Sequence, residues 1–368
     1  MKKIIILGST GSIGQQTLEV VRKYSRKFKI VGLSGGRNIA LLRRQIREFK
    51  PKFVASQKGG KLGGAKLIPL EKLAVQKCAL LVSAIAGVAG LKPTLLALKK
   101  GRNVALANKE SLVLAGDLML QAAKKSGAQI FPIDSEHSGL WQLLNKVDPK
   151  TIRRVVITAS GGALRDIPLT KLKNVKPRQV LAHPTWQMGT KITLDCATLA
   201  NKAFEIIEAH HLFGIPYEKI EAVIHPQSLV HALVETTDGN VFAQLSNPDM
   251  RLPIQLALFE GRREASLVKP LDLSGQKLEF RKIEAKRYPL FFTILQAGKR
   301  GGLAPVVAAV ASEMAGRKFL KGEIKFSKIE RFTRKTLELT PQISEGLTDK
   351  LSTKNILKVI EIIKKHFE

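Results

Sequence analysis

Apolar residues in the first third of the chain fall into short runs, separated by stretches with helical spacing. The runs are rich in Val, Ile and Leu, as expected of buried strands, and lie at residues 4–7, 29–33, 53–55, 79–83, 103–107 and 129–133. Amphipathic stretches between most of them predict helices at residues 14–24, 40–49, 91–99 and 117–125. This alternation predicts an α/β fold, with a parallel, doubly wound sheet of the Rossmann type over residues 1–133.

Beyond Thr151 the predicted strands become fewer and more widely spaced. Runs at residues 153–158, 221–224 and 241–245 predict strands, and an amphipathic helix is predicted at residues 199–211. We therefore expect an α+β domain over residues 134–259, in which a loop rich in Pro, Trp and Gly forms a lid at residues 183–191. Residues 260–287 are predicted as a linker and residues 288–368, with Ile, Leu and Phe at helical spacing, as a C-terminal helical domain.

Composition narrows the class of protein. Hydrophobic residues make up 44% and charged residues 25% of the chain, as in ordinary globular proteins. No apolar run is long enough to cross a bilayer, and a strand predicted close behind Met1 leaves no room for a signal peptide. Cys78 and Cys196 are the only cysteines and lack metal-binding spacing, which indicates a reducing compartment. We expect a cytoplasmic protein without a membrane partner.

The strongly basic charge balance raises nucleic-acid binding as an alternative function. Lys and Arg number 61 against 30 Asp and Glu, for a net charge of +31 at pH 7. Such a field attracts nucleic acids, anionic membranes and phosphorylated metabolites. The lysines are scattered over the whole chain, however, and aromatic residues make up only 5%, unlike surfaces that bind single strands by stacking. We interpret the charge mainly as a solvated surface and keep nucleic-acid binding as a minor alternative.

A glycine-rich turn follows the first predicted strand. Gly8, Gly11 and Gly14 have the spacing G-x-x-G-x-x-G and lead into a helix. Glycines in this context permit a tight turn and let the backbone approach a pyrophosphate, which the helix N-terminus then binds. A purely structural turn is the alternative, but the position in the first strand–helix unit favours a dinucleotide site.

The end of the second predicted strand indicates which dinucleotide is bound. NAD enzymes usually have an acid there that binds the ribose 2′-hydroxyl. Residues 32–38 read Gly-Leu-Ser-Gly-Gly-Arg-Asn and contain no acid. Arg37 can pair with a 2′-phosphate, with Ser34 as a further donor, so NADPH is the predicted cofactor. The alternative for Arg37 is an ordinary solvated arginine.

Two carboxylates follow the last predicted strand of the first domain. Residues 130–137 read Ile-Phe-Pro-Ile-Asp-Ser-Glu-His, which places Asp134 and Glu136 two residues apart. On an extended segment both side chains would point to the same side, where they would raise each other's pKa or bind a cation. Oxygen ligands suit Mg²⁺ or Mn²⁺, with Co²⁺ as a further candidate, better than zinc. The alternative is a strand end whose acids cap the next helix.

A third carboxylate is predicted on the helix at residues 199–211. Glu205 lies three and four residues beyond Lys202 and Asn201, so the three side chains share one helix surface. Glu205 is a candidate third metal ligand and Glu208 competes for this role, while a solvent-exposed helix acid is the alternative for either residue. Three carboxylates would leave open positions on the ion for substrate oxygens and water.

Asn108, Lys109 and Glu110 follow the predicted strand at residues 103–107. They lie at the carboxyl end of a strand, where open α/β sheets bind their ligands. We therefore assign them to the same site as the acidic segment.

These segments together resemble the 1-deoxy-D-xylulose 5-phosphate reductoisomerases. Seven motifs follow one another in the order, and nearly the spacing, of that family, and the resemblance covers nearly the whole chain. They are residues 8–14, 107–111 (Ala-Asn-Lys-Glu-Ser), 133–137 (Ile-Asp-Ser-Glu-His), 160–162 (Ser-Gly-Gly), 183–189 (His-Pro-Thr-Trp-Gln-Met-Gly), Asn201-Lys202 with Glu205, and 225–228 (His-Pro-Gln-Ser). Residues 247–251 (Asn-Pro-Asp-Met-Arg) also fit.

The resemblance implies an enzyme of the non-mevalonate route to isoprenoid precursors. It would rearrange 1-deoxy-D-xylulose 5-phosphate and reduce the product with NADPH to 2-C-methyl-D-erythritol 4-phosphate. Asp134, Glu136 and Glu205 resemble the metal ligands, and Lys109 resembles the cation beside the reacting oxygens, so Lys109, Glu136 and Glu205 form the expected catalytic set. A homodimer is also implied.

The resemblance also implies the binding residues. For the substrate these are Ser135, Glu136, Ser160, His183, Trp186, Cys196, Asn201, Lys202 and Glu205. For the cofactor, together with the glycine turn, they are Gly8, Thr10, Gly11, Ser12, Ile13, Gly36, Arg37, Asn38, Asn108, Glu110 and Gly189. Trp186 and Met188 would close over the substrate and exclude water, although a tryptophan is often a core anchor. His225 is expected to be a structural histidine near the site.

The sequence departs from the family pattern in two places. Cys196 stands where the family usually has serine, and because a thiol is a weak donor, one phosphate hydrogen bond worth about 1 kcal/mol is weakened or lost. Residues 309–313 read Ala-Val-Ala-Ser-Glu where the family often has Asn-Ala-Ala-Asn-Glu, which bears on tail packing or dimer contacts.

Another NADP-dependent dehydrogenase, of the semialdehyde or homoserine type, is the main competing enzyme class. It would need a nucleophilic cysteine or a lysine–aspartate pair without a metal triad. Cys196 is the candidate thiol, and the sequence places no histidine partner beside it, since His183 lies on the lid.

Overall fold

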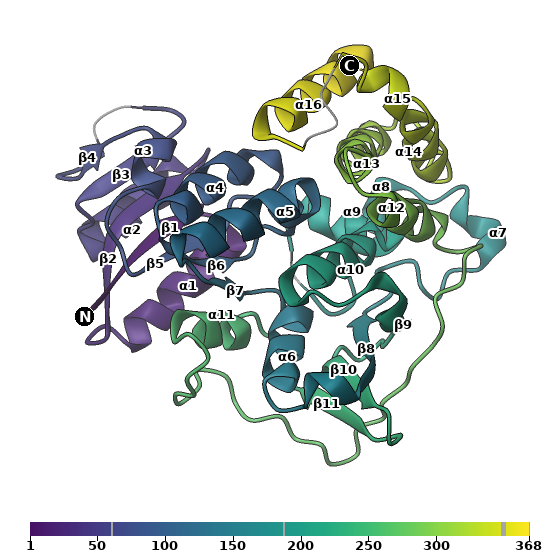
Figure 1. Ribbon diagram of the computed structural model, residues 1–368, viewed down its shortest axis with the longest axis horizontal. Helices are drawn as coiled ribbons and strands as arrows, with labels where there is room; N and C mark the ends of the chain where they lie inside the picture. Colours follow the sequence, from purple (N-terminus) through teal and green to yellow (C-terminus); the bar gives the residue numbers. More distant parts are fainter. Residues whose placement is uncertain (60–61, 187, 347–350, 368) are drawn as a thin grey trace. The chain divides into compact units, whose positions relative to one another are not determined.

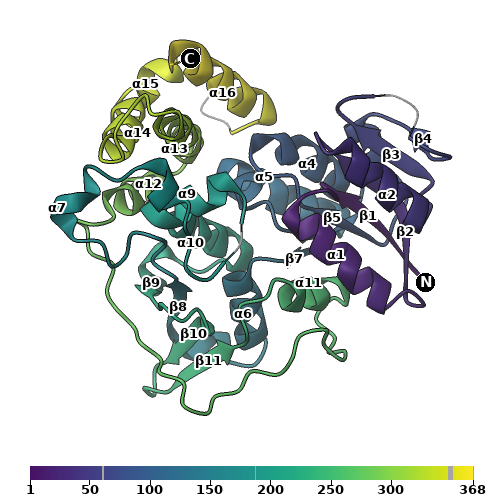
Figure 2. The same ribbon diagram turned by 180° about the vertical axis from the view of Figure 1, so that it is seen from behind.

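The computed structural model describes residues 1–59, 62–186, 188–346 and 351–367. The chain, drawn in Figures 1 and 2, divides into two compact units. Unit 1 comprises residues 1–111, 117–142 and 249–270, and unit 2 comprises residues 112–116, 143–248 and 271–368. The division into domains at residues 133, 259 and 287 stays a prediction.

Unit 1 contains a seven-stranded sheet of order β4-β3-β2-β1-β5-β6-β7, in which every pair of neighbours is parallel. The predicted doubly wound α/β fold is therefore confirmed. The strands are β1 (Lys2–Leu7), β2 (Phe28–Gly35), β3 (Phe53–Ser56), β4 (Lys66–Leu67), β5 (Leu80–Ser83), β6 (Asn103–Leu106) and β7 (Ile130–Pro132). Only β4 was not predicted, because its two exposed residues form no apolar run.

Unit 1 also contains helices. They are α1 (Ser12–Lys23), α2 (Ile39–Phe49), α3 (Leu70–Ala74), η1 (Val88–Gly90), α4 (Leu91–Lys99), α5 (Lys109–Ser126), α6 (Ser135–Leu144) and α11 (Arg251–Leu258), although the central residues of α5 and the last two of α6 group with unit 2. Helix α11 lies beside α1 (Figure 1) and adds Ile254 and Leu258 to the buried core that also contains Ile4, Ile6 and Val82.

Unit 2 contains a four-stranded sheet of order β11-β10-β8-β9. Strand β10 is antiparallel to β8 and β11, whereas β8 and β9 are parallel. The strands are β8 (Ile152–Ala159), β9 (Ile220–Ile224), β10 (Val230–Thr236) and β11 (Val241–Leu245). The central strand β10 was not predicted: its residues are mostly buried on both faces, so the sequence lacks the alternation that marks a half-exposed strand.

Unit 2 also contains helices, and those near the C-terminus pack around α13 (Figure 2). They are η2 (Pro149–Thr151), α7 (Leu169–Leu172), α8 (Pro177–Val180), α9 (Thr190–Thr198), α10 (Ala200–Phe213), η3 (Tyr217–Lys219), α12 (Pro289–Arg300), α13 (Ala304–Leu320), α14 (Lys328–Glu338), α15 (Thr340–Ile343) and α16 (Thr353–Phe367). The predicted helical character of the C-terminal region is confirmed. No helix in the described parts of the chain is long and apolar enough to cross a membrane.

The segment at residues 271–287, called the strap below, contains neither a helix nor a strand. One isolated antiparallel bridge joins it to the sheet of unit 2, where Ile224 and Arg281 exchange two backbone hydrogen bonds of 2.8 Å. The strap is therefore fixed at one point of its length to β9.

Candidate active site

The turn after β1 packs closely against helix α1. Gly8 has a φ of +86°, and a Cβ at this position would lie 2.6 Å from the carbonyl oxygen of Ala84. A Cβ on Gly14 would lie 2.3 Å from the carbonyl oxygen of Gly8. Both positions require glycine, because any side chain would collide with backbone atoms.

Helix α1 begins at this turn with an open N-terminus. In this fully described stretch, its N-cap residue Gly11 makes no side-chain cap hydrogen bond, and the first turn contains no acid. Thr10, Ser12 and Ile13 lie in the turn and at the helix start. The backbone N–H groups and the positive end of the helix dipole can therefore bind an anion such as a pyrophosphate.

The end of β2 lies beside this turn. Ser34 is buried, and its hydroxyl oxygen accepts a hydrogen bond of 2.9 Å from the N–H of Gly8, so this side chain joins β2 to the glycine turn. Arg37 is exposed and Gly36 half-buried. Asn38 caps α2 by accepting from the N–H of Leu41 at 3.0 Å. The exposed guanidinium of Arg37 is thus within the segment that would meet a nucleotide ribose.

The acidic segment is helical where we expected an extended chain. Strand β7 ends at Pro132 and α6 begins at Ser135, and the carbonyl of Asp134 accepts from the N–H of Ser138 at 2.8 Å. Glu136 lies in the first helical turn and accepts a hydrogen bond of 2.6 Å from the Ser135 hydroxyl. The expectation of an extended segment is therefore wrong from Ser135 onward, while Asp134 lies directly before the helix.

Lys109 and Asp134 come together at the carboxyl ends of the adjacent strands β6 and β7. The Lys109 Nζ lies 2.5 Å from the Asp134 Oδ2, and the two side chains are only 9% and 16% exposed. The Nδ1 of the buried His137 lies 4.0 Å from the same oxygen. Two of the predicted site residues are therefore held as a largely desolvated ion pair at the ligand-binding edge of the sheet.

Asn108 fixes the start of the helix that carries Lys109. Its Oδ1 accepts from the N–H of Ser111 at 2.7 Å, and its Nδ2 donates to the carbonyls of Gly87, at 2.9 Å, and Ile85. Glu110 follows in the first turn of α5 and is half-buried. The Asn108 side chain thus forms hydrogen bonds with backbone groups, and its contact with the cofactor stays a prediction.

In unit 2, β8 leads directly into the turn Ser160-Gly161-Gly162. Gly161 and Gly162 have φ values of +81° and +67°. A Cβ on Gly162 would lie 2.6 Å from the carbonyl oxygen of Cys196 on α9. The half-buried Cys196 therefore belongs to the helix against which this turn packs.

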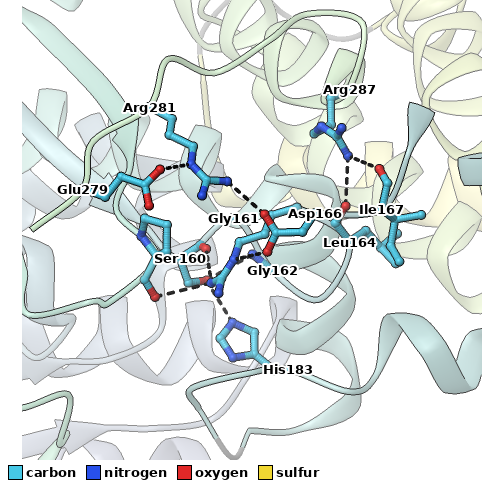
Figure 3. Close-up of polar contacts among 12 residues, drawn as sticks. Ser160, Gly161, Gly162, Leu164, Asp166, Ile167, His183, Glu279, Arg281 and Arg287 are labelled. Carbon is cyan, nitrogen blue, oxygen red and sulfur yellow. Dashed lines mark hydrogen bonds and ion pairs between the residues drawn. The ribbon is translucent and has the colours of Figure 1, made fainter. Parts of the chain in front are cut away.

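Ser160 and His183 are hydrogen-bonded, with 2.9 Å between the Ser160 Oγ and the His183 Nε2 (Figure 3). The His183 Nδ1 accepts from the backbone N–H groups of Trp186, at 2.9 Å, and Thr185, at 3.2 Å. Burial, with a contribution from Arg165, lowers the pKa of His183 to about 4. The ring is therefore neutral at pH 7, and because its Nδ1 accepts, its hydrogen lies on Nε2 and is donated to Ser160.

Helix α10 carries the third predicted cluster. Asn201, Lys202 and Glu205 are 8%, 2% and 2% exposed. Both Lys202, by an ion pair, and Asn201, through its side-chain amide, bind the Glu205 carboxylate. The predicted grouping of these three side chains on one helix surface is confirmed. Glu208 lies on the same helix and is 1% exposed.

The predicted lid region leads into α9. Trp186 and Met188 are half-buried, while Gln187 lies outside the described residues. Gly189 is the exposed N-cap residue of α9, and its carbonyl accepts from the N–H of Thr193 at 3.1 Å.

His225 has the structural role that we expected. It is fully buried, its Nδ1 bonds to the carbonyl of Glu279 at 2.8 Å, and its ring stacks on Phe280.

Sequence reasoning missed Arg165, whose Nη1 donates to the carbonyl of Ser160 at 2.9 Å. A bond from a side chain to a backbone carbonyl has no short sequence motif, so only the proximity of Arg165 to the Ser-Gly-Gly turn could have suggested it.

Comparisons with known proteins match nearly the whole chain. Family models described as 1-deoxy-D-xylulose 5-phosphate reductoisomerase, its C-terminal domain, and DXP reductoisomerase C-terminal domain match residues 4–116, 130–213 and 245–366. The reductoisomerase of Thermomicrobium roseum is 44% identical over 355 residues, covering 94% of this chain and 92% of that protein. That of Prosthecochloris aestuarii is 45% identical over 363 residues, covering 95% and 94%.

Solved structures agree with these matches. A crystal structure of DOX-P reductoisomerase in complex with NADPH, fosmidomycin and magnesium has a TM-score of 0.94 and 33% identity, covering all of this chain and 97% of the other. The reductoisomerase of Zymomonas mobilis in complex with NADPH has a TM-score of 0.89 and 33% identity, covering 99% and 97%. On its motifs, fold and relatives, this chain belongs to the 1-deoxy-D-xylulose 5-phosphate reductoisomerase family.

Proposed function

We propose that this chain rearranges 1-deoxy-D-xylulose 5-phosphate and reduces the product with NADPH to 2-C-methyl-D-erythritol 4-phosphate, as an NADPH-dependent oxidoreductase of isoprenoid precursor synthesis. One observation carries the proposal: a closely packed glycine turn follows β1, and the Lys109–Asp134 pair follows β6 and β7, at the same edge of one parallel sheet. The first feature suits a dinucleotide and the second suits chemistry on oxygen atoms.

NADPH would bind to the turn at Gly8, Gly11 and Gly14. The close backbone packing and the open start of α1 support a pyrophosphate there, since nothing larger than glycine fits and no acid repels the anion. The exposed Arg37 supports a cofactor with a 2′-phosphate, because its guanidinium can bind that group through two hydrogen bonds. The remaining predicted cofactor residues keep the roles that the family resemblance implies.

A divalent cation, Mg²⁺ or Mn²⁺, would be held by Asp134, Glu136 and Glu205. All three offer the oxygen atoms that such ions prefer. Glu205 is nearly fully buried on α10, where a carboxylate is costly unless cations neutralise it, and Lys202 supplies one of them. When bound, the ion would polarise the substrate's ketone and orient its neighbouring hydroxyl. Glu208 is the competing ligand.

Lys109 would stabilise negative charge that develops on the reacting oxygens. Its ammonium group is held in place by Asp134 and is largely shielded from water, which strengthens its electrostatic effect. Ser135, whose hydroxyl now donates to Glu136, would contact a substrate hydroxyl.

The substrate's phosphate would bind to Ser160, Cys196, Asn201 and Lys202. The contact between the Ser160 turn and the helix of Cys196 supports a shared site for the first two. Lys202 supplies the positive charge that a phosphate requires. Trp186, on the loop that begins at His183, would exclude water from the bound substrate.

A homodimer in the cytoplasm is the proposed working form. Strand β11 lies at the edge of the unit 2 sheet and exposes Val241 and Phe242, which are 56% and 47% exposed. Apolar residues on an edge strand favour pairing with a second chain. Size-exclusion chromatography with light scattering would measure the mass, and a monomer at micromolar concentration would refute the dimer.

The test of function is NADPH oxidation with 1-deoxy-D-xylulose 5-phosphate, with the product identified by mass spectrometry. Turnover is expected with Mg²⁺ or Mn²⁺, should stop with EDTA, and should return when the cation is added back. Fosmidomycin, which is bound in a related structure, should inhibit it. Failure to form 2-C-methyl-D-erythritol 4-phosphate would refute the proposed function, and turnover unaffected by EDTA would refute the metal assignment.

A further inference from the structure

Side-chain hydrogen bonds to backbone carbonyls hold the turn at residues 160–167, part of which is shown in Figure 3. Four backbone carbonyls in this segment each accept a hydrogen bond from a side chain. Arg165 binds the Ser160 carbonyl at 2.9 Å, Tyr288 binds that of Gly161 at 3.0 Å, and Arg287 binds those of Leu164 and Ile167 at 3.0 and 2.7 Å.

The guanidinium of Arg165 is itself held from several directions. Besides the Ser160 carbonyl it binds the carbonyl of Pro226 at 3.3 Å and, through Nε, the carboxylate of Asp166 at 3.0 Å. The other oxygen of Asp166 lies 2.9 Å from Arg281 of the strap. These two arginines lower the pKa of Asp166, with Arg281 the larger cause, so the carboxylate stays charged. Because its side chain is only 19% exposed, Arg165 has little freedom to reorient.

The hydroxyl of Ser160 has its acceptor capacity filled. Its oxygen accepts from the Nε2–H of His183 at 2.9 Å and from the N–H of Gly162 at 3.2 Å. A hydroxyl oxygen accepts two hydrogen bonds and donates one. Since both described partners of Ser160 Oγ are donors, the hydroxyl hydrogen is directed to an outside acceptor, such as a phosphate oxygen.

The direction of the hydrogen bond between His183 and the Ser160 hydroxyl depends on the protonation state of His183. A protonated ring would carry a hydrogen on Nδ1, which would then face the backbone N–H groups of Thr185 and Trp186. The positive charge of Arg165 adds to burial in disfavouring that protonation. Arg165 thus acts on Ser160 twice, through the Ser160 carbonyl and through His183.

We propose that Arg165 is a positioning residue for the substrate's phosphate: it holds the Ser160 turn and the neutral His183 so that the Ser160 hydroxyl donates to the phosphate. This proposal rests on the proposed function, which places Ser160 at the phosphate. Arg165 itself need not touch the substrate.

The kinetic test replaces Arg165 with Met, which keeps the length of the side chain and removes its donors and charge. The KM for 1-deoxy-D-xylulose 5-phosphate should rise about tenfold or more, the effect of losing one charged hydrogen bond. The kcat should change much less, and the Kd for NADPH should not change, because Arg165 lies outside the nucleotide site. R165K should lie between R165M and the wild type, since it keeps the charge but has a single donor group.

Arg153→Met is the matched control, because Arg153 lies on β8, is 66% exposed and pairs only with Glu235 among the contacts of the described residues. It should leave the KM unchanged. An unchanged KM in R165M would overturn the proposal, and so would a parallel loss of kcat, substrate affinity and NADPH binding in both R165M and R165K, which would indicate a merely structural role.

A second measurement does not depend on turnover. The ¹⁵N chemical shifts of the His183 ring, assigned with a His183→Gln variant, report which nitrogen carries the hydrogen. The wild type should show a neutral ring with hydrogen on Nε2, and R165M should show a higher pKa for this ring. A hydrogen on Nδ1 in the wild type would overturn the proposal. If the wild-type protein fails to convert the substrate, the proposed function fails, while the ring spectrum still tests the action of Arg165 on His183.

Discussion

The close packing of the glycine turn on α1 makes Gly14 the most informative residue to change. In Gly14→Ala the new Cβ would lie 2.3 Å from the carbonyl oxygen of Gly8 and 2.5 Å from the Cα of Ser9. Both are backbone atoms, so no side chain can move aside. To reach ordinary van der Waals contact, the turn must separate from the helix by about 1 Å.

Overpacking of this kind costs about 1–3 kcal/mol. For a unit of this size each kcal/mol lowers the Tm by roughly 2–4 °C. Because the same displacement moves the N–H groups at the start of α1 away from the proposed pyrophosphate position, we also expect the Kd for NADPH to rise about tenfold or more. Urea unfolding and a fluorescence titration with NADPH measure the two effects.

Gly11→Ala is the matched control in the same turn. Its Cβ would lie 3.4 Å from the Gly8 carbonyl oxygen, an ordinary contact, and the φ of −78° suits any residue. G11A should therefore keep the stability of the wild type and, if the pyrophosphate approaches this backbone, still lose NADPH affinity. A G14A variant as stable as the wild type would refute the packing argument, and unchanged NADPH affinity in both variants would refute the assignment of the turn.

Three further predictions follow from the site. Replacing Glu205 with Gln should lower kcat far more than replacing Glu208 with Gln, and the reverse order in steady-state kinetics would exchange the two ligand assignments. Arg37→Ala should lower the kcat/KM for NADPH about tenfold or more while sparing that for NADH, since a charged hydrogen bond to the 2′-phosphate is lost; equal losses with both cofactors would contradict this role. The pKa of His183 is lowered from 6.5 to about 4, so the unfolded chain binds the proton more readily. The resulting stability is fully present above pH 6.5 and is lost as the pH falls toward 4; His183→Gln should flatten this part of the stability profile in urea unfolding, and an unchanged profile would show that His183 does not cause it.

Some elements lie where their apolar runs and helical spacing predict them. Helix α4 and strand β11 have the predicted bounds, at residues 91–99 and 241–245. Strand β10 was missed because burial on both faces removes the alternation. Helix α5 begins eight residues earlier than predicted because Asn108 caps it, a signal that we interpreted only as a ligand-binding residue.

The site was predicted less completely than the fold. The grouping of Lys202 with Glu205 follows from helix spacing, and in the structure the two side chains form an ion pair. The pairing of Lys109 with Asp134 depends on the neighbouring order of β6 and β7, which only the sheet topology supplies. The helical start at Ser135 was missed because the two acids were interpreted as the end of a strand. Contacts of a side chain with a distant carbonyl, such as that of Arg165, depend on packing and have no local pattern.

Along the chain, the strap leads from Pro270, the last residue of unit 1, to helix α12 of unit 2, but its residues do more than connect the two. Arg281 is tied to β9 through its backbone and to Asp166 through its side chain, and Arg287 and Tyr288, at the end of the strap, hold carbonyls beside Ser160. Replacing residues 271–287 with a glycine–serine spacer of equal length would preserve the connection but remove the ion pair and the side-chain hydrogen bonds that these residues make. Designs that graft or shorten this region should therefore retain its arginines.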